Sequence, residues 1–511
     1  MLKINYRPEI DGLRAVAVVS VILYHAQILV LGNNYFKGGF IGVDIFLVIS
    51  GYLITSLILK EIKVTGRFSF LNFYERRARR ILPVLFFIML FSLPFAWVYL
   101  LPSDLTDFSK SILFSLGFSS NFYFHYTGLI YGATEGLLKP FLHTWSLSLE
   151  EQFYIIFPFF LYFSYKFFKN KLLVLMLIFF LISIILATYT SLSSPSFSFY
   201  SLHTRIWELL AGSILAYLEN KNKLRYNFKN NFINKGLPLL GLLLITYSII
   251  FFDDKKTLHP SLYTLSPIIG TCLIIWFSNM HDLVGKIFSS KLFVGTGLIS
   301  YSLYLWHWPL FAYAWLAYGT KPPVDIRLAL LAVSVLLAWL TYALVEKPIR
   351  FGAVRAYPVP ALSIGMLLLG IGGVTVFAAH GFPERSVAEI NRSLAYDLRV
   401  PTDSRTSDGT CATKYGLETG EAYVCFVNAP DPRMLVIGDS VSMAFYSGIH
   451  AKLFSEKSVF VGAHSFNWAR PDCTRPANLE KWMAGGEVCQ RVVRSTFDIL
   501  AREPSIEGVV I

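Results

Sequence analysis

Residues 39–59 read GFIGVDIFLVISGYLITSLIL, in which Asp44 is the only charged side chain. An α-helix needs about 20 consecutive apolar residues to cross a bilayer, so this stretch predicts a membrane-spanning helix. The composition extends the prediction to most of the chain, because 54% of its 511 residues are hydrophobic and only 15% are charged. Soluble proteins usually carry about a quarter charged residues. The chain is therefore predicted to be a polytopic α-helical membrane bundle.

Ten further apolar segments predict spans of the same kind. Arg205 and Glu208 interrupt the sixth, which is the weakest of the set. The first segment contains Arg14 and His25 and has no small-residue cleavage site, so we interpret it as a retained span and not as a signal peptide. The eleven predicted spans are 13–31, 39–59, 81–101, 145–165, 172–190, 201–218, 236–252, 261–279, 293–318, 327–345 and 359–379.

The basic residues are distributed asymmetrically about these spans. With the N-terminus inside, the inner loops carry 23 Lys and Arg residues and the outer loops carry 8. An excess of positive charge marks the cytoplasmic side of a membrane protein. The pattern predicts a multi-pass protein of the bacterial inner membrane with a cytoplasmic N-terminus and, after an odd number of spans, a periplasmic C-terminus. It also accounts for the net charge of +12 without a nucleic-acid partner.

From about residue 380 the composition becomes that of a soluble protein. Residues 381–430 are predicted to be a periplasmic linker with an irregular lead-in, and residues 431–511 alternate strands with helices, as in a parallel α/β sheet. Because the last strand runs to Ile511, we expect this domain to be incomplete in the chain. The predicted elements are a strand running into a turn at 433–440, strands at 458–463 and 506–511, and helices at 441–453 and 488–502.

The cysteines agree with an outer location for this part. Cys272 lies in an apolar segment and is predicted to be a buried small side chain. The other four lie in the polar C-terminal part, where an even number favours two disulfide bonds in an oxidising compartment. Of the three possible pairings we favour the sequence-adjacent one, 411–425 with 473–489, and four free thiols are the alternative. These candidates are Cys411, Cys425, Cys473 and Cys489.

Ionisable side chains inside the predicted spans are costly and need a reason. Arg14 and His25 are eleven residues apart on the first span, which places them on one helix face about 16 Å apart along the axis. Asp44, His143, Glu150 and His307 fall at a depth similar to that of His25. We therefore expect one polar cavity in the outer half of the bundle. A structural network of salt bridges is the alternative.

A dense cationic cluster lies at the predicted inner face and comprises Arg76, Arg77, Arg79 and Arg80. A topology signal or a lipid head-group site would explain it. The other interpretation is an anchor for a polyanionic cytoplasmic donor, because guanidinium groups bind phosphates bidentately. Glu346 is also predicted at the inner face, where it could pair with neighbouring arginines.

Five segments follow one another in the first 350 residues: EIDGLR at 9–14 with His25, GVDIFLVISG at 42–51, Arg76–Arg80, WSLSLEEQFY at 145–154 and SYSLYLWHWP at 300–309. In these segments and in their order, the first 350 residues resemble the acyltransferase-3 family of membrane acyltransferases. This resemblance implies acetyl-CoA as donor, a cell-envelope glycan as acceptor, essential roles for Arg14 and His25, and donor handling by Arg76–Arg80. It adds a mechanism in which His25 acts as general base or transiently carries the acyl group.

The C-terminal part contains Gly438-Asp-Ser440 where a predicted strand turns into a helix. A serine in such a turn exposes its hydroxyl beside a helix N-terminus, although an N-cap serine is the commoner meaning of the pattern. The region resembles the SGNH hydrolase-like domains often fused to acyltransferase-3 proteins, which implies that Ser440 receives the acyl group and passes it to a sugar hydroxyl. The Asp-x-x-His of that family does not follow Ser440. We therefore expect this chain to lack the base that would activate Ser440.

Taken together, these features predict a membrane-bound O-acetyltransferase with lipopolysaccharide O-antigen as its first candidate acceptor and with no metal site. Peptidoglycan O-acetylation is the alternative within enzymes. A polysaccharide transporter or flippase and a glycan-binding receptor are alternatives of other classes. The predicted division is an acyltransferase-3 domain at 1–350, an additional membrane helix at 351–380, the linker at 381–430, and part of an SGNH-like domain at 431–511.

Overall fold

The computed structural model divides the chain into two compact units, Met1–Pro383 and Glu384–Ile511, each of which is described by itself. The boundary lies close to the predicted change in composition near residue 380. The described residues are 6–29, 32–130, 136–168, 171–222, 231–280, 282–351, 358–385, 424–427, 434–438, 458–462, 500–502, 504–506 and 508–510.

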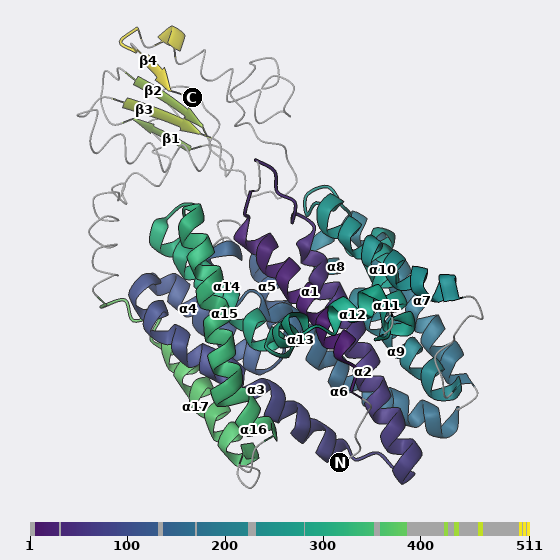
Figure 1. Cartoon of the computed structure of the whole chain (residues 1–511). Coiled ribbons are helices and arrows are strands. Elements are labelled where there is room, and N and C mark those ends of the chain that lie inside the picture. Colours follow the sequence, from purple (N-terminus) through teal and green to yellow (C-terminus); the bar gives the residue numbers. More distant parts are fainter. Residues whose placement is uncertain are drawn as a thin grey trace. The chain divides into compact units, whose positions relative to one another are not determined.

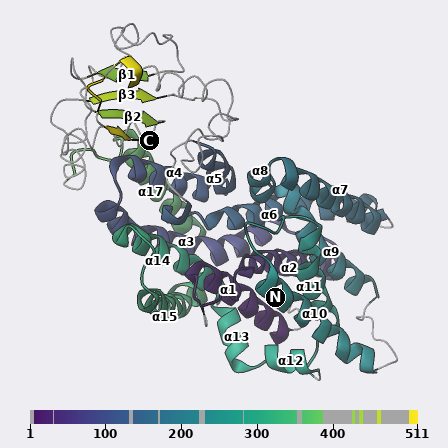
Figure 2. The ribbon, with the colours of Figure 1, turned by 90° about the horizontal axis from the view of Figure 1, so that it is seen from above.

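The first unit is a bundle of helices. In Figure 2, α1 and α2 lie between α14 and α15 on one side and α7, α10 and α11 on the other. Its elements are α1 Pro8–Ala26, η1 Gly39–Ile41, α2 Gly42–Thr65, α3 Phe70–Tyr99, α4 Pro102–Leu116, α5 Ser120–Gly128, η2 Gly136–Leu138, α6 Thr144–Phe167, α7 Leu172–Ser193, α8 Pro195–Tyr200, α9 Leu202–Asn222, α10 Asn231–Phe251, η4 Leu262–Thr264, α11 Leu265–Phe277, α12 Leu283–Phe288, α13 Lys291–Leu298, α14 Ser300–Tyr318, α15 Val324–Thr341, η5 Tyr342–Glu346, α16 Lys347–Phe351 and α17 Pro358–Ala378 (Figure 1).

A helix overlaps each of the eleven predicted spans. Among the described residues, five helical segments are long and apolar enough by themselves to cross a membrane, and two shorter apolar helices accompany them. Such helices are those of a membrane bundle. The five are Gly39–Thr65, Phe70–Tyr99, Leu172–Ser193, Val324–Phe351 and Pro360–Ala378, and the shorter two are Lys235–Phe251 and Leu262–Phe277.

The predicted ninth span is wrong as a single helix, because residues 293–318 divide between α13 and α14 at Ile299. Gly295 and Gly297 precede the break, and glycine weakens a helix interior. Gly297 also lets α13 lie against α1, since a Cβ atom there would stand 1.9 Å from the backbone oxygen of Asp11. The break therefore lets the chain pack closely around α1 before α14 begins.

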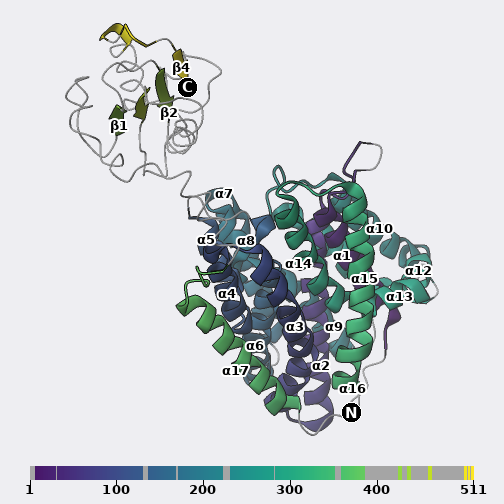
Figure 3. The ribbon, with the colours of Figure 1, turned by 90° about the vertical axis from the view of Figure 1, so that its left-hand side faces the viewer.

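The predicted third span is also displaced. Helix α3 starts at Phe70, eleven residues before the predicted start, with the Ser69 side chain accepting a hydrogen bond from the backbone N–H of Asn72. Arg76–Arg80 therefore lie on a helix and not in a loop. Helices α4 and α5 occupy a segment for which no helix was predicted, and α17 packs along α3 and α4 (Figure 3).

Close contact between α2 and α9 fixes the centre of the bundle. A Cβ atom on Gly51 would lie 1.8 Å from the backbone oxygen of Leu209, and one on Gly212 would lie 1.9 Å from that of Val48. Small residues allow two helix backbones to approach in this way. The contact brings the polar side chains of α9 within reach of those on α2.

The second unit contains a four-stranded sheet of order β1-β3-β2-β4. Strand β2 Met434–Gly438 is parallel to β3 Ser458–Gly462 and to β4 Gly508–Val510, so all three predicted strands and their parallel arrangement are present. Strand β1 Val424–Val427 was not predicted; it lies within the expected linker and pairs with β3 in antiparallel orientation.

Several predictions for this unit fall outside the described residues. They include Ser440, the helix at 441–453 and, apart from residues 500–502, the helix at 488–502. Cys411, Cys473 and Cys489 lie there too, and of Cys425 only the backbone is described, in β1.

Candidate functional site

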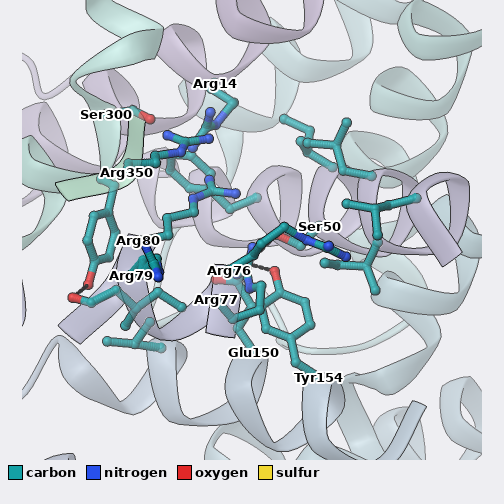
Figure 4. A pocket seen from close by; sticks show the side chains of 18 of the residues that line it. Arg14, Ser50, Arg76, Arg77, Arg79, Arg80, Glu150, Tyr154, Ser300 and Arg350 are labelled. Carbon is teal, nitrogen blue, oxygen red and sulfur yellow. Dashed lines mark hydrogen bonds between the residues drawn. The ribbon is translucent and has the colours of Figure 1, made fainter. Parts of the chain in front are cut away.

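Arginines from three helices line a cavity of about 600 Å³, which we call the arginine cavity. Figure 4 shows Arg14 and Arg350 near Ser300, and Arg77 beside Glu150 and Tyr154. Helix α3 explains the arrangement, because Arg76, Arg77, Arg79 and Arg80 lie close together on it, within little more than one turn. The cavity is also lined by apolar side chains of α2, so its wall combines charge with hydrocarbon. Its arginines are Arg14, Arg76, Arg77, Arg79, Arg80 and Arg350.

Arg80 differs from the other arginines of the cavity in its partners. In the part of the chain that the structure describes, no carboxylate lies within ion-pair distance of Arg80, and the positive charges of Arg14, Arg77 and Arg350 act on it. A guanidinium placed in this way is suited to bind an anion. The other five are paired: Arg14 with Asp11 at 3.4 Å, Arg76 with Glu61 at 3.2 Å, Arg77 with Glu151 at 3.5 Å, Arg350 with Glu346 at 3.3 Å, and Arg79 with Glu75.

Glu150 lies in the arginine cavity and not with the histidines. Its carboxylate accepts hydrogen bonds from the hydroxyl groups of Ser50 and Tyr154. The guanidinium of Arg77 stacks over the ring of Tyr154, with its Cζ atom 4.0 Å from the ring centroid. These contacts hold one wall of the cavity in place.

His25 lines a second cavity, of about 680 Å³, which we call the histidine cavity. Its Nδ1 atom lies 3.0 Å from Nε2 of His307, and the ring of Trp308 packs against it edge-on at 4.5 Å between centroids. Among the described residues, Nδ1 of His307 has no hydrogen-bond partner. In the tautomer in which Nδ1 of His25 donates to Nε2 of His307, Nε2 of His25 is left as a base.

His143 completes the group of histidines. It lines the same cavity, and its ring centroid lies 5.9 Å from that of His307. Within the described residues, neither ring nitrogen of His143 has a hydrogen-bond partner of ordinary geometry. The structure thus brings together His25 of α1, His307 of α14 and His143 of the turn that precedes α6.

Asp44 belongs to a buried charged cluster beside the histidine cavity. Its carboxylate lies 2.5 Å from Nη2 of Arg205 and 3.0 Å from Nε2 of His259, and Nε of Arg205 lies 3.1 Å from Glu208. The side chains of Asp44, Arg205 and Glu208 have no exposed surface. Arg205 and His259 line the histidine cavity, whereas Asp44 stands behind them.

The prediction of a single polar cavity is therefore replaced by two cavities and a buried cluster. Arg14 lines the arginine cavity and His25 lines the histidine cavity, although both stand on α1. Glu346 accepts hydrogen bonds from Ser302 and Arg350, in the π-helical turn η5 that precedes α16. Sequence reasoning missed Arg350 and His259 as site residues: Arg350 was considered only as a possible partner of Glu346, and His259 lies far along the chain from its partners Asp44 and Arg205.

A model of the acyltransferase domain matches residues 7–343. The chain belongs to this family. Its match contains the lining residues of both cavities except Arg350 and Phe351. The acyltransferase domain thus contains nearly all of the residues that line the two cavities.

Curated relatives of the chain are O-acetyltransferases by name. The peptidoglycan O-acetyltransferase OatA of Listeria monocytogenes is 33% identical over 355 residues, which are 68% of this chain and 56% of that protein. The O-acetyltransferase OatA of Staphylococcus aureus is 30% identical over 365 residues, 69% and 58% of the two chains. A Staphylococcus aureus protein named "Putative O-acetyltransferase SAR0937" is 30% identical over 465 residues, 86% and 74%. The chain spans somewhat more than half the length of the two OatA proteins, and no solved structure matches it.

Proposed function

We propose that the protein transfers acetyl groups from cytoplasmic acetyl-CoA through the membrane to a hydroxyl group of a cell-envelope glycan. The observation that carries this proposal is the position of Arg14 and His25 on one helix, each lining one of two adjoining cavities. A cationic cavity suits the phosphates of the donor, and a histidine cavity suits proton transfer. Membership of the acyltransferase family supports the reaction class.

The donor would bind by its phosphates in the arginine cavity. Arg80 supplies the guanidinium that has no carboxylate partner among the described residues, and Arg14, Arg77 and Arg350 surround it. Charge-assisted hydrogen bonds to phosphate are roughly twice as strong as neutral ones. The pantetheine arm would then lie along the apolar side chains of α2 and extend towards the histidine cavity.

The transfer would take place at His25. Nε2 of His25 removes the proton from the acceptor hydroxyl while the hydroxyl oxygen attacks the thioester carbonyl. The carbon–sulfur bond then breaks, and the departing thiolate receives the same proton from the imidazolium. The step needs the tautomer in which Nδ1 of His25 donates to Nε2 of His307, 3.0 Å away. A transient acyl-imidazole on His25 is the other form of the same role.

Peptidoglycan is the acceptor that we propose, in place of the first prediction of lipopolysaccharide O-antigen. The reason is the Listeria relative, whose name states that substrate. The acceptor hydroxyl would reach the site directly or through Ser440 of the second unit, whose resemblance to SGNH domains suggested an acyl relay. In this proposal the helices of the first unit cross the bacterial inner membrane, and the second unit lies in the periplasm.

Mass analysis of envelope glycans tests the function. Cells that express the full-length gene should show one added acetyl mass on peptidoglycan fragments and none on lipopolysaccharide. The His25→Ala variant should lose the added mass while its amount in the membrane stays at the wild-type level. Unchanged acetylation by that variant would overturn the role of His25. An acetyl mass on lipopolysaccharide alone would overturn peptidoglycan as the acceptor.

A further inference from the structure

Val43 of α2 and Tyr304 of α14 line both cavities, and in the described part of the chain no other residue belongs to both linings. Arg80 lines only the arginine cavity, and His25 lines only the histidine cavity. The wall between the cavities is therefore formed by these two side chains.

Tyr304 is held in this wall by contacts on both sides. Its hydroxyl donates a hydrogen bond to the backbone oxygen of His143 at 3.0 Å and lies 2.7 Å from Oγ of Ser146. Ser146 lines the arginine cavity, whereas His143 lines the histidine cavity. The rings of His143 and His307 pack against the Tyr304 ring, with centroids 5.6 and 5.4 Å away.

Val43, the second shared lining residue, is also fixed. Its side chain is 8% exposed, and a β-branched side chain has few rotamers in a helix. The next residue, Asp44, is tied to Arg205 and His259 in the buried cluster. The backbone of α2 cannot move at this point without disturbing those ion pairs.

We propose that Val43 and Tyr304 form a gate that sets the largest acyl group the protein transfers. The inference rests on the proposed function. A thioester whose phosphates are bound near Arg80 meets His25 only if its acyl end passes between these side chains. An acetyl group places a single methyl between Val43 and Tyr304. Each additional methylene of a longer acyl group must fit between these two fixed side chains. One methylene in a close-fitting apolar site changes kcat/KM by about 10- to 200-fold.

The test compares acetyl-CoA, propionyl-CoA and butyryl-CoA as donors for the purified full-length protein in lipid vesicles. Wild type should prefer acetyl over butyryl by more than about tenfold in kcat/KM. Val43→Ala should reduce that preference by about tenfold or more. The matched control Leu53→Ala removes a side chain that lines only the arginine cavity and should leave the preference unchanged. Equal preference in Val43→Ala and wild type would refute the gate.

A narrowing variant supplies independent evidence if the widened protein is unstable. Val43→Leu should lower kcat for acetyl-CoA about tenfold with its KM unchanged, because the phosphate site is untouched. Wild-type kcat in that variant would equally refute the gate. If wild type transfers no acyl group from any of the three donors, the proposed function fails; if it transfers acetyl but the Val43 variants behave as wild type, only the gate fails.

Discussion

Arg80 is the residue on which donor binding should depend most. Replacement by Gln removes charge-assisted hydrogen bonds to phosphate worth about 1.5–3 kcal/mol, so KM for acetyl-CoA should rise roughly 10- to 100-fold. Arg76→Gln is the matched control, because that side chain is 44% exposed and already paired with Glu61. Steady-state kinetics over a range of acetyl-CoA concentrations measure both. Equal KM values for Arg80→Gln and Arg76→Gln would contradict the role given to Arg80.

His307 is expected to act through His25 as a positioning residue. His307→Leu removes the acceptor for Nδ1–H of His25, so kcat should fall by about two orders of magnitude while KM for acetyl-CoA stays constant. His307→Gln keeps an acceptor oxygen in nearly the same place and should recover part of kcat. If both variants lose kcat and also show a raised KM for acetyl-CoA, the cause is disturbed packing and not the orientation of His25.

At the scale of the helices, the contact between α2 and α9 should tolerate no added side chain. Gly212→Ala places a Cβ atom 1.9 Å from the backbone oxygen of Val48, and overpacking of this kind costs about 1–3 kcal/mol. The thermal unfolding temperature of the purified protein should therefore drop by several degrees. Gly295→Ala is the control, because no atom lies within 4 Å of a Cβ atom there. Equal unfolding temperatures for the two variants would show that the helices do not pack in this way.

The buried cluster on the same two helices gives a second stability prediction. Arg205→Met leaves the carboxylates of Asp44 and Glu208 without their cation, which costs about 3–5 kcal/mol. Adding Asp44→Asn removes one of the uncompensated charges and should restore part of the loss. Thermal unfolding of the two single variants and the double variant measures the coupling. Additive losses would mean that Asp44 and Arg205 do not interact.

The helices themselves were largely predictable, because runs of about 20 apolar residues have one stable arrangement in lipid. The residues at which the helices begin and end were less predictable. Nothing in the composition of residues 70–80 separates a helical turn from a basic loop, and the break at Ile299 depends on how Gly297 packs against α1. The periodicity of α1 correctly grouped Arg14 and His25 on one helix, but it carried no information about the neighbours that place them in different cavities.

For the molecule as a whole, the sequence led to one polar cavity where the structure has two. The reason is that depth along a span can be counted from the sequence, whereas the partner of each buried charge depends on which helices meet. In the sequence, Arg205 interrupts an apolar segment. In the structure, it is the ion-pair partner of Asp44. In the proposed function, the two cavities that adjoin at Val43 and Tyr304 supply the route for transfer across the membrane.

Sidedness of transfer in sealed vesicles tests that route most directly. Radiolabelled acetyl-CoA, which does not cross lipid, is supplied on the face of the N-terminus, and soluble peptidoglycan fragments are enclosed on the opposite face. We predict label on the enclosed fragments with wild-type protein and none with His25→Ala. Label only on fragments that share a compartment with the acetyl-CoA would contradict the account.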